Sequence, residues 1–99
     1  AKDHIWGYTV GNDVTARDLQ FSDLQWARSK GFDTFCPIGP WVETEFDPED
    51  QVIESRVNGE VRQRASLSDM HFKPLELVSY VSENVTLLPG DVIVTGSPA

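Results

Sequence analysis

The sequence has one cysteine, Cys36, and two histidines, His4 and His71, among its 99 residues. A single cysteine cannot form an internal disulfide framework, which is typical of small extracellular domains. No carboxylate or cysteine stands at a metal-ligand spacing beside either histidine, so we do not expect a zinc site. The chain also lacks an apolar run of about 18 residues, so we do not expect a membrane-spanning helix.

Basic residues are few as well: eight lysines and arginines accompany sixteen aspartates and glutamates, and the net charge is −8. We do not expect a chain this acidic to bind nucleic acid or an anionic membrane. Residues 1–8 lack a signal-peptide pattern, and with the lone cysteine this favours a cytoplasmic protein. The start without methionine and the end inside a turn-like segment predict that these 99 residues are a piece of a longer chain.

What the sequence does contain is typical of a globular α+β protein. Hydrophobic residues make up 39% of the chain and aromatic residues 10%, which argues against disorder. Two segments have helical spacing, and they cover residues 15–26 and 74–85. Five others have the composition of strands, and they cover residues 5–10, 41–44, 51–57, 60–64 and 92–95. We expect one α+β unit with two short helices and a buried last strand.

Local signals support several of these elements. Asn58-Gly59 lies between two strand-like segments and is the strongest short signal for a β-hairpin. Pro74 and Glu76 stand where the first turn of a helix favours them. Residues 28–37 are predicted to be a loop, and the acidic run at 45–50 a turn.

The corner between the first strand and the first helix is the most informative part of the chain. Thr15 and Asp18 have the spacing of a capping box, and helical geometry places Arg17 and Gln20 on one side. Asp13 lies just outside the helix start. We therefore expect an acid, a guanidinium and an amide to converge here, at a place where sites often form. The simpler interpretation is a surface helix with solvated charges.

Lys30 follows this helix. A lysine in a partly buried loop can anchor a carboxylate or polarise a carbonyl, although a solvated surface lysine is the commoner case. Asp13 is a suitable oxygen ligand for a hard cation. One carboxylate alone does not hold a metal ion, and no other member of such a ligand shell is evident in the sequence.

Four motifs resemble, in order, signatures of the fumarylacetoacetate hydrolase family: GYTVGNDVTARDLQ at 7–20, QWARSKGFDTFCPIGPW at 25–41, RVNGEVRQ at 56–63 and LPGDVIVTGSPA at 88–99. They resemble most the branch with acylpyruvate hydrolases, oxaloacetate decarboxylases and 2-hydroxyhepta-2,4-diene-1,7-dioate isomerases. The resemblance implies a mixed β-roll, in which residues 1–99 are the C-terminal part of one catalytic domain. It also implies a homodimer that uses Mg²⁺ or Mn²⁺, or Ca²⁺ in some members.

The resemblance also implies roles for individual residues. Asp13 matches a metal ligand, and Thr34 lies where some members place another oxygen near the cation. Lys30 matches the lysine beside the metal that contacts the substrate's oxygens. Substrate-binding roles are implied for Arg17, Gln20 and Ser97. Ser97 replaces the usual threonine of the family, but it keeps the hydroxyl that can bind a carboxylate.

Other parts of the family's site lie upstream of the matched motifs, namely a Glu-x-Glu ligand pair and a His-Glu lid dyad. Glu43 and Glu45 have the spacing of that pair, but they follow Lys30, so we do not transfer the role. The implied activity is metal-dependent hydrolysis, decarboxylation or isomerisation of a small 2-oxo acid. The alternative is a non-catalytic structural or dimerisation portion, in which the polar residues only satisfy one another.

Overall fold

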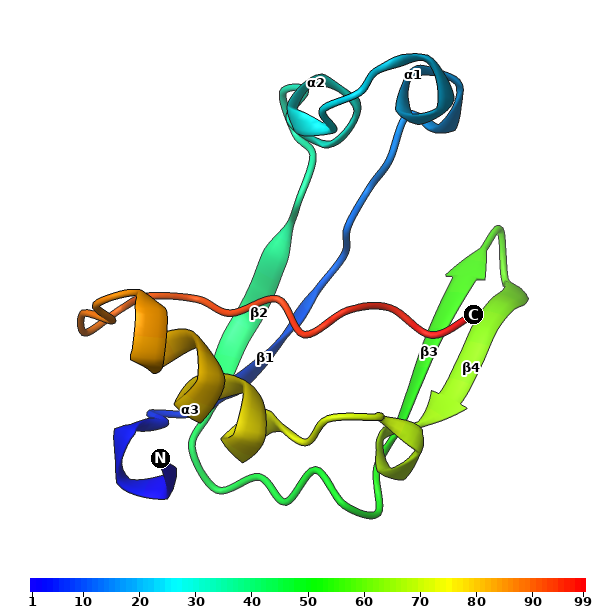
Figure 1. Cartoon of the computed structure of the whole chain (residues 1–99). Helices are drawn as coiled ribbons and strands as arrows, with labels where there is room; N and C mark the ends of the chain where they lie inside the picture. The colour runs from blue at the N-terminus through cyan, green and yellow to red at the C-terminus, as the bar shows by residue number, and fades with distance from the viewer. The chain divides into compact units, whose positions relative to one another are not determined.

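The computed structural model describes all of residues 1–99, which form two compact units. One unit consists of residues 7–44, and the other combines residues 1–6 with 45–99. Each unit contains one two-stranded antiparallel sheet and short helical segments (Figure 1). The α+β class predicted from the sequence is therefore confirmed.

In the unit of residues 7–44, β1 (Tyr8–Gly11) pairs antiparallel with β2 (Ile38–Glu43). Between these strands the chain forms α1 (Arg17–Ser22) and α2 (Ala27–Lys30). Figure 1 shows both helices at the same end of the strand pair. The strand predicted at 5–10 thus begins later, and the strand predicted at 41–44 begins earlier. β1 ends at Gly11.

The prediction of one helix over residues 15–26 is wrong, because two short helices replace it. The capping box is also wrong. The Thr15 hydroxyl donates to the backbone carbonyl of Asp13 (3.0 Å), and Ala16 takes the N-cap position without a side-chain cap. Because α1 starts only at Arg17 and Ala16 is its N-cap, Thr15 lies one residue before the capping position.

α1 ends early because local contacts close it. The amide of Asp23 donates to the carbonyl of Leu19 (2.8 Å), and the carboxylate of Asp23 pairs with Arg28 (2.7 Å). This ion pair spans the break between the two helices. The hydrogen bonding of Arg28 to the Asp23 carboxylate lowers the pKa of Asp23. The loop predicted at 28–37 consequently begins only after Lys30.

The second unit contains five elements: η1 (Lys2–His4), β3 (Val52–Val57), β4 (Glu60–Ser66), η2 (Leu67–Asp69) and α3 (Pro74–Asn84). β3 and β4 pair antiparallel, with a register shift between Ser55 and Arg56. The predicted hairpin is confirmed. The whole chain has three α-helices and two 3-10 helices, which is more than the two helices that the sequence predicted.

The turn of this hairpin has the backbone conformation that its sequence requires. Asn58 has φ 51° and Gly59 has φ 81°, as expected for a two-residue turn with positive φ at both positions. Farther along the two strands, the Glu54 carboxylate accepts hydrogen bonds from Arg56 and Arg64. The hydrogen bond from Arg56 has the larger effect and the one from Arg64 the smaller, and both lower the pKa of Glu54 below its ordinary value of 4.5.

The helix predicted over 74–85 is confirmed and ends at Asn84. Pro74 occupies its first position, and the backbone amide of Lys73 donates to Oε2 of Glu76 (2.8 Å). The acidic segment before β3 forms the predicted turn, in which the amide of Glu49 donates to Asp47 Oδ1 (3.0 Å). None of the helices is long and apolar enough to span a membrane.

The strand predicted over residues 92–95 does not form. This segment pairs with neither two-stranded sheet, and Val92 and Val94 are 59% and 55% exposed. No hydrophobic side chain of the chain is buried, and Leu24 is 99% exposed. The only buried residue is Ser29. The expectation that the last strand is buried is therefore wrong, and the apolar side chains of the chain remain open to contact.

Candidate functional site

The side chains of Lys30 and Asp13 form an ion pair in which Nζ lies 2.5 Å from Oδ2. A backbone hydrogen bond explains how residues 17 positions apart meet: the amide of Ala16 donates to the carbonyl of Ser29 (2.8 Å). Ser29 is fully buried at this point. The bond ties the corner after β1 to α2, so the last residue of α2 lies beside Asp13.

The ammonium of Lys30 has further neighbours. It donates to Oγ1 of Thr15 (3.3 Å) and lies 5.7 Å from the centroid of the Trp26 ring. The side chains of Lys30 and Asp13 are 29% and 36% exposed. The pair is thus partly shielded by protein, yet a small molecule can still reach its charged atoms.

Arg17 and Gln20 form a second polar pair, one turn apart on α1. Nη1 of Arg17 donates to Oε1 of Gln20 (2.6 Å). This bond leaves other guanidinium N–H groups and the Gln20 amide N–H₂ available as donors. The predicted convergence of acid, guanidinium and amide is therefore only partly correct, because Asp13 pairs with Lys30 rather than with Arg17.

Thr34 lies in the loop between α2 and β2. Its φ of 69° falls in the left-handed region, which β-branched residues avoid. Such a conformation costs on the order of 1–3 kcal/mol and is often found at functional sites. Thr34 makes no side-chain hydrogen bond with Asp13 or Lys30, so its role near a cation stays a prediction.

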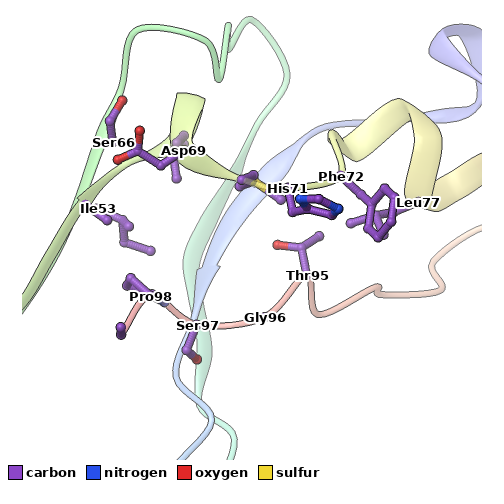
Figure 2. Close-up of a pocket in the computed structure, with 14 residues that line it drawn as sticks. Ile53, Ser66, Asp69, His71, Phe72, Leu77, Thr95, Gly96, Ser97 and Pro98 are labelled. Atoms are coloured by element: carbon purple, nitrogen blue, oxygen red, sulfur yellow. The ribbon is translucent and has the colours of Figure 1, made fainter.

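Ser97 belongs to the other unit, where it lines a pocket of about 430 Å³. The polar side chains around this pocket include Asp69, His71 and Thr95. Figure 2 shows the Thr95 side chain directed toward His71, whereas the Ser97 side chain points away from it. Spacing in the sequence did not predict this pocket, because its walls come from β3, the end of β4, the segment that leads into α3, α3 itself and the C-terminal residues. The carboxylate-binding role of Ser97 stays a prediction.

The donor set in these 99 residues fits part of a hard-cation site. Asp13 offers the carboxylate oxygen that Mg²⁺ or Mn²⁺ prefers. However, no three histidine, cysteine, aspartate or glutamate residues come together closely enough to hold a metal ion. Because a hard cation needs about six oxygen ligands, Asp13 can supply one of them, and the remaining protein ligands would have to come from elsewhere.

The geometry can now be set beside known proteins. The chain matches the fumarylacetoacetate (FAA) hydrolase C-terminal family over residues 1–99. It is 47% identical over 102 residues to oxaloacetate tautomerase YisK of Bacillus subtilis, with 100% of this chain and 34% of that protein aligned. The chain therefore belongs to the fumarylacetoacetate hydrolase family, as its four motifs predicted.

Solved structures agree with this assignment. The chain superposes on 2-hydroxyhepta-2,4-diene-1,7-dioate isomerase from Mycobacterium marinum with a TM-score of 0.95 and 55% identity, over 100% of this chain and 39% of that one. For fumarylacetoacetate hydrolase from psychrophilic Exiguobacterium antarcticum the TM-score is 0.94 and the identity 49%, over 99% and 36%. The family fold is confirmed. The chain spans 38–41% of the length of three curated relatives that are at least 54% identical to it.

Three residues at the corner were not identified as site residues from the sequence. Thr15 and Trp26 contact the Lys30 ammonium, and Ser29 fixes the backbone beside it. The only sequence feature that could have indicated a site role for Thr15 is its position between Asp13 and Arg17. Trp26 and Ser29 could not be found in this way, since their roles depend on the break between α1 and α2.

Proposed function

We propose that the protein carrying this sequence is an enzyme that moves a proton within a small 2-oxo acid, by keto–enol tautomerisation or double-bond isomerisation. The observation that carries this proposal is the Lys30 ammonium, held beside Asp13 on a partly exposed corner. The relatives support the substrate class, because oxaloacetate, named for the Bacillus subtilis tautomerase, is a 2-oxo acid.

The residues of this corner suit such a substrate. Guanidinium groups bind carboxylates in a fixed, often bidentate geometry, so Arg17 binds the substrate's carboxylate. Gln20 holds Arg17 through the 2.6 Å hydrogen bond and so limits the orientations of the guanidinium. We also propose that the hydroxyl of Ser97 donates to a substrate carboxylate, as the family resemblance implies.

Lys30 acts on the charge that develops during reaction. In this proposal the His-Glu dyad, which the family resemblance places upstream of these residues, takes a proton from the carbon next to the keto group. The electron pair of the broken C–H bond then moves toward the keto oxygen, and an enolate forms. An ammonium positioned at that oxygen stabilises the enolate more than the neutral ketone, and this lowers the barrier. Asp13 would be one ligand of the Mg²⁺ or Mn²⁺ (or Ca²⁺) that our proposal includes, and the bound ion would supply Lewis acidity to the reaction.

Cleavage of a C–C bond is a second candidate function. The close match to fumarylacetoacetate hydrolase from Exiguobacterium antarcticum favours it. Loss of an acyl group to water, or of CO₂ from oxaloacetate, also leaves an enolate at the same carbonyl. The stabilising role of Lys30 is the same in all three reactions, so product analysis must distinguish them.

The test compares the full-length protein with two variants that each lose one lysine charge. Lys30→Met removes the proposed charge, and Lys2→Met is the matched control on the exposed η1 segment. With Mn²⁺ present, the disappearance of enol-oxaloacetate is followed by ultraviolet absorbance, and pyruvate release is measured in the same samples. Acetylpyruvate serves as the substrate for hydrolysis.

We expect Lys30→Met to lower kcat about 100-fold or more, the usual effect of removing one such stabilising donor. Lys2→Met should leave turnover unchanged. Enol loss without pyruvate identifies a tautomerase, and pyruvate release identifies C–C cleavage. A full-length protein that is inactive on both substrates would contradict the proposal and favour a non-catalytic portion. A fully active Lys30→Met variant would instead contradict the role proposed for Lys30. The proposal also includes a homodimer, which sedimentation equilibrium can test.

A further inference from the structure

The Thr15 hydroxyl connects the two charged residues of the corner. Its Oγ1 donates to the backbone carbonyl of Asp13 (3.0 Å) and accepts from Nζ of Lys30 (3.3 Å). We propose that Thr15 is a positioning residue that holds the Lys30 ammonium in the orientation needed to meet the substrate. This inference rests on the proposed function of Lys30.

The numbers of donors and acceptors on the Thr15 hydroxyl and the Lys30 ammonium support this assignment. A hydroxyl has one hydrogen to donate and two lone pairs to accept. Because the Thr15 hydrogen is directed to the carbonyl of Asp13, the rotation of the hydroxyl is fixed and a lone pair is left for Lys30. The acceptor that Lys30 meets is therefore oriented before any substrate arrives.

The ammonium has three N–H donors, and two of them have protein acceptors. One acceptor is Oδ2 of Asp13 and the other is Oγ1 of Thr15. The third donor stays available for a substrate oxygen. If the Asp13 carboxylate binds a cation, its hold on the ammonium weakens, and Thr15 becomes the main protein acceptor for Lys30.

The backbone keeps Thr15 and Lys30 together independently of this hydrogen bond. Ala16 and Ser29, the neighbours of these two residues in sequence, share the 2.8 Å bond from amide to carbonyl. The Trp26 ring also lies near the ammonium, with its centroid 5.7 Å from Nζ. Removing the hydroxyl should therefore release the tip of the Lys30 side chain without opening the corner.

The test uses Thr15→Val, which keeps the shape and removes the hydroxyl, and Thr15→Ser, which keeps the hydroxyl, both in the full-length protein. For each variant we would measure kcat and KM with enol-oxaloacetate, and Mn²⁺ affinity by electron paramagnetic resonance. Oxalate, a planar mimic of an enolate beside a carboxylate, would be titrated by calorimetry. Circular dichroism and thermal melting would report the fold.

We expect Thr15→Val to lower kcat and oxalate affinity about tenfold, as losing a hydrogen bond to a charged group predicts. KM and Mn²⁺ affinity should change less than about twofold, because Thr15 acts through Lys30. Thr15→Ser should restore most of both losses. Wild-type kcat and oxalate affinity in Thr15→Val, or equal losses in both variants, would overturn the inference.

Two other outcomes separate this inference from the proposed function. A Thr15→Val variant that unfolds while Thr15→Ser stays folded would show that the hydroxyl supports the fold, and it would overturn the positioning role alone. A wild-type protein that neither binds Mn²⁺ nor turns over a 2-oxo acid would overturn the proposed function, and the inference with it.

Discussion

The ammonium of Lys30 and the carboxylate of Asp13 lie 2.5 Å apart, although 17 positions separate them in the sequence. With side chains 29% and 36% exposed, the two charges form a pair that is still in contact with water. Such pairs contribute only about 0–1 kcal/mol to the free energy of unfolding. Stability is therefore a weak explanation for this pair, and we propose instead that it serves to bind a charged ligand.

Replacing Asp13 with asparagine tests its predicted role as a metal ligand. Asp13→Asn keeps the shape of the side chain and removes its charge. In the full-length protein we expect Mn²⁺ affinity and activity to fall together, while the urea midpoint of unfolding changes little. Asp18→Asn, on the exposed first turn of α1, is the matched control and should bind Mn²⁺ normally. Unchanged metal affinity in a folded Asp13→Asn protein would rule the ligand role out.

The contacts between site residues that are close in the sequence could be predicted from the sequence. The contact between Arg17 and Gln20 follows from helical spacing over one turn, and it is found in the structure. The contact between Lys30 and Asp13 depends on the chain reversing between α1 and α2. Periodicity alone did not predict that reversal, which lies at the break between α1 and α2 that the Asp23–Arg28 ion pair spans.

The same distinction holds for the fold. The Asn58-Gly59 hairpin and the helix that starts at Pro74 depend on neighbouring residues, and both were predicted correctly. A strand also needs a partner strand. Residues 92–95 have the right composition for a strand, but neither sheet of the structure pairs with them. Their composition predicts a tendency to form a strand, but it does not predict which strand they pair with.

Valine at position 59 should destabilise the hairpin. Gly59 has φ 81°, and a Cβ built there meets no atom within 4 Å. The cost of Gly59→Val is therefore one of backbone conformation rather than of crowding, and we expect about 1 kcal/mol or more. Chemical denaturation of the full-length protein measures it. Gly59→Asn should cost less, because asparagine tolerates positive φ. Equal unfolding midpoints for glycine and valine would count against this turn.

Stability at acid pH should depend on Glu54. Hydrogen bonds from Arg56 and then Arg64 lower the pKa of this carboxyl in the folded protein below 4.5. A lowered folded pKa gives stability that is present above the unfolded pKa and is lost as pH falls through the folded value. Between about pH 5 and pH 3 the free energy of unfolding should therefore fall more steeply in the wild type than in Glu54→Gln. Parallel curves for the two proteins would contradict this role.

The isolated 99-residue chain should expose an unusual amount of apolar surface. No hydrophobic side chain is buried, and Phe21 and Leu24 are 82% and 99% exposed. Large exposed apolar surfaces mark places where other protein normally packs. We therefore expect the purified chain to bind the dye 1-anilinonaphthalene-8-sulfonate and to unfold with low cooperativity. A cooperative transition without dye binding would show that the chain buries a core of its own.

The same isolated chain should have little or no catalytic activity. Asp13 is a single carboxylate, no cluster of three ligands is present, and a hard cation needs about six oxygens. The family's lid dyad lies outside the matched motifs, and losing a positioned acid–base group costs roughly 10²–10⁴-fold in rate. Oxaloacetate and acetylpyruvate would be assayed with excess Mg²⁺ or Mn²⁺, after circular dichroism has confirmed secondary structure. The full-length protein is the positive control. Turnover by residues 1–99 comparable with that control would show that Lys30, Arg17 and Asp13 suffice, and that the proposed need for further ligands is wrong.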